Sequence, residues 1–293
     1  MTILLHNVGF GLVTASIIAL ASVAFSLQFS VTTTPNFAHG DILTVGAYAA
    51  YGAQLLTNNI LIEALAAMVG GAVIASLLNF GLVQPFLRRG AKRLTIFLVT
   101  VSFGWILQDL ILIIFTGNAT VIQLPAVTLQ HVGPFLWTQL DEIIIASTVV
   151  ILALLHVMLR YTKFGTSLRA ISDNPQLARL AGINYPRVVQ MTWAIDGVIA
   201  GFAGFVLAAY VGALTPTIGF SFLVVIFAAS VVGGLGKPYG TMVGALVIGL
   251  AMEISAGYIP GGYKTSVAFA ILIAVLLVRP RGVFSSDVWN FAE

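Results

Sequence analysis

The side chains best suited to bind a solute lie in one polar stretch, Thr32 to Gly52 (TTTPNFAHGDILTVGAYAAYG), between two apolar runs. Burial in lipid would penalise the polar members of this stretch, which include three threonines, Asn36, His39 and Asp41. Pro35 and Gly40 interrupt a helix here, so the half-helix that follows would offer free N–H groups to a polar solute. An interfacial loop in which Asp41 caps the next helix is an equal alternative.

Four further polar residues lie inside apolar runs and are candidates for a wet pathway. They are Ser102, Gln108, Asp109 and Glu253. Asp109 and Glu253 could instead lie near helix ends and reach water. The four histidines lack the spacing and the carboxylate neighbours of a metal site, and no catalytic triad or metalloprotease motif occurs, so an intramembrane enzyme is disfavoured.

A second polar stretch, Arg160 to Arg187, carries five of the thirteen basic residues. Within it we predict a helix from about Pro175 to Ala181, because Pro suits a first turn and Gly182 suits a left-handed C-cap. Its candidate N-cap residues are Ser172, Asp173 and Asn174. Two turns are too short to be stable alone, so the helix needs a docking partner. The alternative is a solvated loop whose arginines only fix orientation.

Composition makes the chain an all-α integral membrane protein of one domain, residues 1–293. Hydrophobic residues make up 59% and charged residues 8%, and the mean hydropathy is +1.04. We expect eight or nine transmembrane segments, of which the second, fifth, seventh and ninth are short and therefore broken or tilted. The apolar runs are 8–31, 41–57, 60–86, 94–116, 143–159, 191–212, 222–235, 239–258 and 265–278.

The basic residues orient these segments. They cluster at 88–93, at 160–187 and at 279–281, which places these three regions in the cytoplasm. Nine crossings then put the N-terminus outside, whereas a re-entrant 35–57 region would put it inside. The loop at about 116–142 falls on the external side, and its pattern suggests a small hairpin.

Glycines mark a second irregular region, Val231 to Gly249, where the chain must turn at or just inside the membrane. It is no nucleotide-binding loop, because Val231 and Pro238 stand where that motif needs Gly and Ser or Thr. The runs Gly40 to Gly52 and Gly240 to Gly249 could be halves of an internal repeat. Close helix packing is expected along one small-residue face, formed by Gly197, Gly201, Gly204 and Ala208.

Two motifs in this order resemble the LivH-type permeases of branched-chain amino acid ABC importers. The first is Asn36-Phe37-Ala38-His39-Gly40-Asp41 with Gly46-Ala47-Tyr48; the second is Arg169-Ala170 with Asp173-Asn174 and Ala178 to Ile183. The resemblance implies a multi-pass subunit of a bacterial or archaeal inner membrane that moves small neutral, branched-chain or hydrophobic amino acids. Its implied partners are a second related permease, two ABC ATPase subunits and a periplasmic binding protein. ATP would be bound by those ATPases, with no cofactor and no nucleic acid on this chain.

The resemblance also implies roles for individual residues. The solute pathway would be bordered by Asn36, Phe37, His39, Gly40, Asp41, Ser102 and Gln108. Coupling to an ATPase would involve Arg169, Asp173, Asn174, Pro175, Ala178, Gly182 and Ile183. Similar permeases carry urea or short amides, and more distant ones carry sugars. A self-sufficient secondary transporter or channel that uses Asp109 and Glu253 as ion sites is the alternative from another class.

Overall fold

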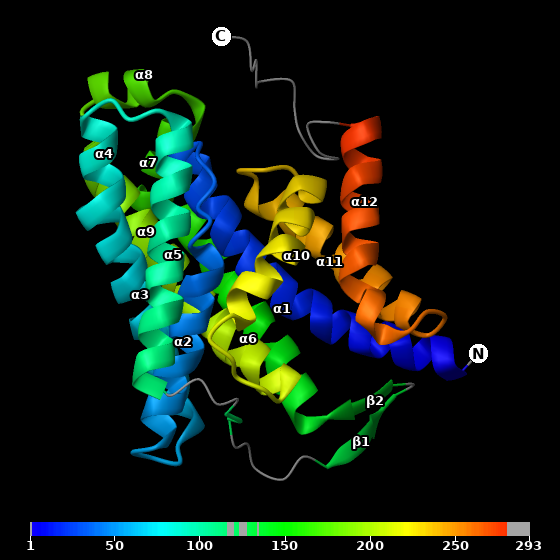
Figure 1. The fold of residues 1–293 in the computed structure, drawn as a ribbon. Coiled ribbons are helices and arrows are strands. Elements are labelled where there is room, and N and C mark those ends of the chain that lie inside the picture. Colours follow the sequence, from blue (N-terminus) through cyan, green and yellow to red (C-terminus); the bar gives the residue numbers. More distant parts are fainter. Residues whose placement is uncertain (1, 116–119, 123–127, 134, 280–293) are drawn as a thin grey trace.

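The computed structural model describes residues 2–115, 120–122, 128–133 and 135–279, and helices dominate these residues (Figure 1). Within these described ranges, seven helical segments are long and apolar enough to cross a membrane, and α10 is a shorter apolar helix, which confirms an all-α, multi-pass membrane protein. The helices are α1 (Thr2–Thr32), α2 (His39–Gln54), α3 (Ile60–Leu78), α4 (Gln84–Arg88), α5 (Arg93–Phe115), α6 (Gln139–Tyr161), α7 (Lys163–Asp173), α8 (Pro175–Leu180), α9 (Tyr185–Val211), α10 (Ile218–Gly233), α11 (Pro238–Ala256) and α12 (Lys264–Val278). A π-helical segment, Asn79–Val83, joins α3 to α4, and a short 3₁₀ helix, Gly261–Tyr263, precedes α12.

Two short helices, α2 and α10, have 16 residues each and begin next to one another. A Cβ on Gly40 or on Gly219 would overlap the backbone of the other residue, so the two first turns are in direct contact. The helices around them mirror each other: α1 packs along α11, and α9 packs along α3. The structure therefore relates the half-helix α2 to α10, not to Gly240–Gly249, which lies within α11.

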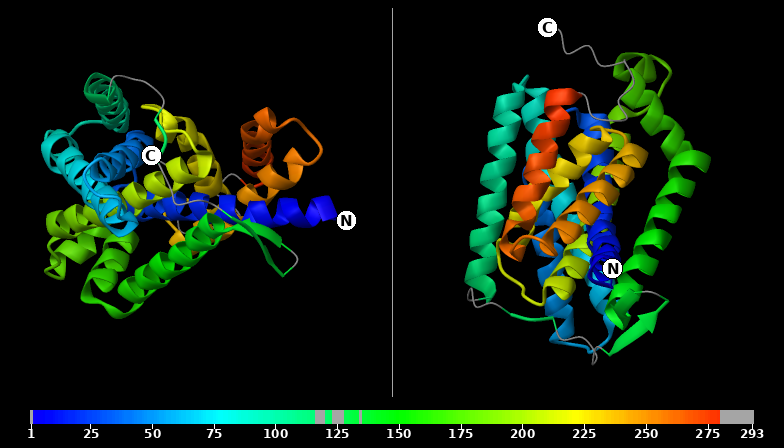
Figure 2. Two further views of the ribbon diagram at one scale, coloured as in Figure 1. Left: turned by 90° about the horizontal axis from the view of Figure 1, so that it is seen from below. Right: turned by 90° about the vertical axis from the view of Figure 1, so that its right-hand side faces the viewer.

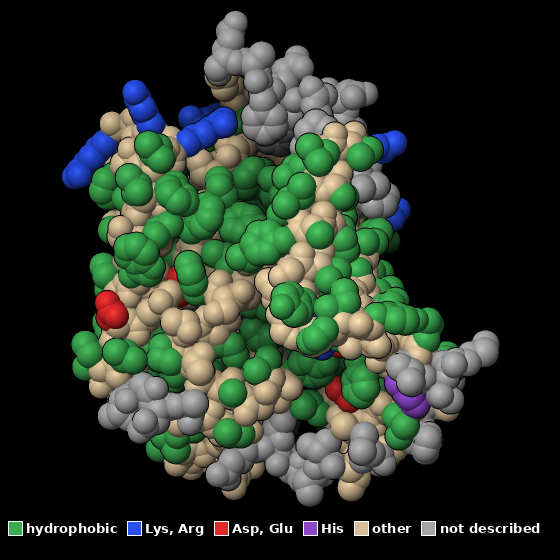
Figure 3. All heavy atoms as spheres, turned by 45° about the vertical axis from the view of Figure 1, so that its right-hand side comes forward, with side chains coloured by type: hydrophobic (Ala, Val, Ile, Leu, Met, Phe, Trp, Pro, Cys, Tyr) green, Lys and Arg blue, Asp and Glu red, His purple; other side chains and the backbone are tan. Residues whose placement is uncertain are grey.

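Two of the three basic clusters, 88–93 and 160–187, share one end of the molecule, as the sequence predicts, whereas only Arg279 of the third, 279–281, lies within the described residues. Thr32, Arg88 and Arg179 line one cleft there, which brings the ends of α1, α4 and α8 together. Figure 3 shows most of the visible Lys and Arg side chains at this end. At the start of α1, Gly9 lies against Trp137 at the opposite end, so the positive-inside rule places the N-terminus outside.

The central polar stretch is more ordered than the sequence analysis predicted. It contains two helices, α7 and α8, where one was expected (Figure 1). The prediction missed α7 because the stretch was read for charge; its apolar face, Leu168 and Ile171, is buried, and Thr162 caps its first turn by accepting from the Gly165 N–H. The cytoplasmic stretch is thus a helical hairpin packed on the membrane domain.

The external side carries an antiparallel hairpin, β1 (Leu129–Val132) and β2 (Phe135–Thr138), as predicted. It leads directly into α6, which has 23 residues and so is not short, contrary to the prediction. A capping box between Thr138 and Asp141 starts α6 several residues before the apolar run begins, because these polar side chains satisfy the free N–H groups of its first turn.

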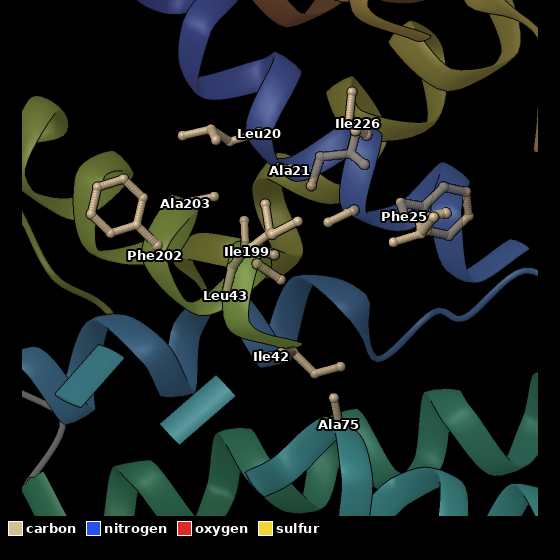
Figure 4. Close-up of a cluster of buried hydrophobic side chains, with 14 of the residues drawn as sticks. Leu20, Ala21, Phe25, Ile42, Leu43, Ala75, Ile199, Phe202, Ala203 and Ile226 are labelled. Carbon is tan, nitrogen blue, oxygen red and sulfur yellow. The ribbon is translucent and has the colours of Figure 1, made fainter. Parts of the chain in front are cut away.

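The core lies where α1, α2, α9 and α10 meet, and Figure 4 shows its apolar side chains. Glycines bring the backbones into contact: Gly201 packs on Ala67 of α3, and Gly204 packs on Leu43 of α2. The predicted small-residue face of α9 is therefore a packing surface. Seen from below, α1 runs through the middle of the molecule while α5, α6 and α12 lie at its edges (Figure 2).

Candidate solute pathway and coupling surface

Two side-chain hydrogen bonds fix the segment that leads into α2: one is made by a side chain of the segment itself and the other by a side chain of α5. The Asn36 Oδ1 accepts from the Ala38 N–H at 3.1 Å, and the Phe37 N–H donates to the Thr100 Oγ1 at 3.4 Å. Thr33 takes a left-handed backbone conformation, φ 52°, which turns the chain back toward the membrane. This segment and the first turn of α2 therefore form a discontinuous entry into the half-helix α2, as the clustered helix breakers suggest.

Asp41 and Gln108, both predicted to border the pathway, contact each other. The Gln108 Nε2 donates to the Asp41 Oδ1 at 2.7 Å, and the other carboxylate oxygen lies against the position where Gly104 has no Cβ. Asp41 is buried, whereas Gln108 is partly exposed. The small residue on α5 thus lets the Asp41 carboxylate of α2 approach α5, although Gly104 lies 63 positions after Asp41 in the sequence.

The His39 side chain is fully buried. Its Nδ1 is 3.3 Å from the Oδ1 of Asp196 on α9, and its Nε2 is 3.0 Å from the carbonyl oxygen of Ala21 on α1. The sequence analysis missed Asp196. The signal was available, since Asp196 is the one acidic residue in the apolar run 191–212.

Aromatic rings from two other helices pack around Phe37 of this motif. Phe37 packs edge-on against Phe97 of α5 at 4.6 Å between ring centroids and against Phe227 of α10 at 5.0 Å. All three rings are partly exposed. An apolar, partly accessible surface thus lies between α5 and α10, beside the contacting first turns of the two half-helices.

The structure does not bring every predicted residue to this surface. Ser102 and Asp109 are exposed on α5, away from the core. Glu253 is nearly buried and fully engaged: it accepts from the Thr14 hydroxyl at 2.9 Å and from the Lys264 ammonium at 2.6 Å. A carboxylate already neutralised in this way is poorly suited to bind a transported cation.

The helix α8 has the caps that the sequence predicts. The Asn174 Oδ1 accepts from the N–H groups of Gln176 and Leu177, and Gly182 has φ +82°. The Ile183 N–H closes the last turn by donating to the Ala178 carbonyl oxygen at 3.0 Å. The boundary differs by one residue from the prediction, because Ala181 is the C-cap.

One side of α8 holds it to the domain and the other is open. Ala178 is buried, whereas Leu177 and Leu180 are 62% and 84% exposed. Pro175 opens the helix at its first position, and Asp173 ends α7. The exposed leucines stand at the end of the molecule where Arg179 and Arg88 line one cleft.

Arg169 ties the α7–α8 hairpin to α6, since its guanidinium donates to the Leu159 carbonyl oxygen at 2.8 Å. The same residue, with Asp173, lines a cleft of about 550 Å³ between α7 and the turn before α11. This hydrogen bond and the cleft place the hairpin directly against the end of α6.

Comparison with known sequences places the chain in a family. Residues 7–276 match the family model described as "Branched-chain amino acid transport system / permease component", and the chain belongs to this family. It is 31% identical to the high-affinity branched-chain amino acid transport system permease protein LivH of Escherichia coli K12, over 93% of this chain and 92% of that protein. A probable LivH of Methanocaldococcus jannaschii is 28% identical, over 93% and 90%.

A more distant likeness covers part of the chain. The ribose import permease protein RbsC of Bacillus subtilis is 34% identical over 136 residues, 44% of this chain and 42% of that protein. The chain is thus a permease component, a transport protein of a multi-pass membrane family, and the resemblance stated from its two motifs is confirmed.

Proposed function

We propose that this chain is the permease subunit of an ABC importer in a bacterial or archaeal inner membrane. It moves small neutral amino acids, branched-chain or hydrophobic, and is powered by ATPase subunits bound in trans. The observation that carries the proposal is α8, a capped cytoplasmic helix that presents two exposed leucines in a chain of the permease family.

The coupling half of the proposal rests on α7 and α8. Isolated helices of this length are unstable in water, so the caps and the buried Ala178 serve to hold a preformed surface for a partner. The sequence has no nucleotide-binding loop at its Gly-rich turn, so the work has to arrive through such a surface. A groove on one ATPase subunit would receive Leu177 and Leu180.

The pathway half rests on the surface between α5 and α10. Glycine contacts close the spaces among α2, α3 and α9, so the solute would pass beside the half-helices and not between them. A second related permease would complete the walls of such a pathway. The partly exposed Phe37, Phe97 and Phe227 fit an aliphatic side chain, and Asp41 with Gln108 supplies a polar flank.

Two facts favour amino acids over the other solutes of similar permeases. The relatives that align over nearly the whole chain are named for branched-chain amino acids, whereas the ribose permease aligns over less than half. The pathway surface is aromatic and offers few hydrogen-bonding groups for a sugar. A periplasmic binding protein would deliver the solute at the external end.

The test is reconstitution with the second permease and the ATPases encoded in the same genome. We expect leucine, presented by its binding protein, to stimulate ATP hydrolysis and to be taken up into vesicles. Leu177→Glu with Leu180→Glu should abolish both while the chain still inserts. The matched control is Leu56→Glu. It introduces a charge at a leucine that is 86% exposed and lies at the end of the molecule opposite to α8. Unchanged hydrolysis and uptake in the double variant would refute the coupling role of α8.

The alternative, a self-sufficient transporter, predicts uptake by this chain alone. It is disfavoured because Glu253 is engaged with Lys264. The experiment measures uptake in vesicles that contain only this chain. If uptake occurs and Asp109→Asn abolishes it, the self-sufficient transporter is supported and the proposal is overturned.

A further inference from the structure

The His39 and Asp196 side chains are a buried ionisable pair to which the proposed transport cycle assigns no role. Both are completely shielded from solvent. Apart from this contact, the Asp196 carboxylate has no hydrogen-bond partner among the described residues, and the His39 Nδ1 faces it at 3.3 Å. A bare carboxylate or an unsatisfied imidazole in this position would cost several kcal/mol, roughly the penalty for an uncompensated buried charge. The pair must therefore neutralise itself.

The carbonyl group of Ala21 determines which nitrogen of His39 carries a hydrogen. The Ala21 carbonyl oxygen can only accept, so the His39 Nε2, 3.0 Å away, must carry a hydrogen and donate it. The Nδ1 then faces the Asp196 Oδ1, and two lone pairs would repel each other unless a proton lies between them. That proton can sit on either atom. In both cases the two side chains together hold one proton there and carry no net charge.

We propose that His39 and Asp196 are a positioning pair, a one-proton clamp that ties the first turn of α2 to α1 and α9. These two helices open the two mirrored halves of the fold, so His39 links both halves to the half-helix α2. Two residues before it, Phe37 faces the surface between α5 and α10. The clamp would thus set where the motif meets the solute, without contacting the solute itself.

The first readout is the labelling rate of a single introduced cysteine, which does not depend on transport. Such labelling is specific because the chain has no cysteine of its own. Phe37→Cys reports on the start of α2 through its labelling rate with N-ethylmaleimide, and Leu56→Cys reports on the loop after α2. We expect Asp196→Leu to raise the labelling rate at position 37 about tenfold, as expected when one buried hydrogen-bonded contact is lost, with no change at position 56. Asp196→Asn should leave both rates at the parental value, because its amide can donate to Nδ1 and so replace the proton.

The second readout is leucine uptake, and this arm rests on the proposed function. Asp196→Asn should transport at the parental level and Asp196→Leu about tenfold more slowly. Thr192→Val is the matched control: Thr192 is as buried, lies one turn earlier in α9, and bonds its own helix by donating to the Val188 carbonyl oxygen. If the parental chain, reconstituted with its partner subunits, takes up no leucine, the proposed function fails, while the labelling rates still decide the clamp.

A double variant separates positioning from packing. His39→Leu with Asp196→Leu replaces the pair by apolar side chains, a change that is often neutral for stability, so the protein should reach the membrane in normal amount. We expect fast labelling at position 37 and lost uptake. If the double variant labels and transports at the parental rates, the pair only fills space in the core and does not position α2. A defect in Asp196→Asn as large as in Asp196→Leu would overturn the shared proton.

Discussion

A single methyl group on Gly40 tests the contact on which the two half-helices depend. A Cβ there would lie 2.5 Å from the carbonyl oxygen of Gly219 and 3.0 Å from the Cα of Phe220, where an ordinary contact begins at 3.4 Å. Both neighbours are backbone atoms that cannot rotate away. The first turns of α2 and α10 would therefore have to separate by about 0.9 Å, and overpacking of this kind costs about 1–3 kcal/mol.

Gly52 supplies the matched control for Gly40, because it lies in the same helix and a Cβ there meets nothing within 4 Å. Both Ala variants gain the same helix propensity, about 0.5–1 kcal/mol, so the difference between them isolates the contact. We expect Gly52→Ala to raise or keep the thermal unfolding midpoint of the detergent-solubilised protein. Gly40→Ala should lower it and Gly40→Leu should also block uptake. Equal midpoints for the two Ala variants would refute the contact.

Three further perturbations test other parts of the structure. Gly182→Val should strain the end of α8 by about 1–2 kcal/mol, because φ is +82°, and should abolish solute-stimulated ATP hydrolysis while subunits still co-purify; parental hydrolysis would make the cap incidental. Lys264→Met should destabilise the protein, because it leaves Glu253 buried and unpaired, and Lys264→Met with Glu253→Gln should recover stability in thermal unfolding. Cysteines at Gly90 and Thr166 should react with an impermeant reagent from the cytoplasmic face, and reaction of position 166 from outside would reverse the topology.

Local rules made much of this fold predictable. Long apolar runs predicted the membrane class, because lipid forces backbone groups into helices, and the basic residues predicted which loops share one end of the molecule. The caps of α8 were equally local, since Asn174, Pro175 and Gly182 act on residues within one turn. For α2 and α10 the sequence predicted only that the segments are short. It did not predict that their first turns are in contact.

Contacts between distant segments were decided only by the tertiary structure. Asp196 is 157 positions after His39, and only the packing of α9 against α2 makes its carboxylate a partner of the imidazole. The same holds for Glu253, whose charge looked available for ion binding until α12 placed Lys264 beside it. Sequence patterns specify what each residue needs, such as a neutralised charge or a close backbone approach, because these needs arise from the residue itself. Which residue meets the need depends on helices that come together only in the folded bundle.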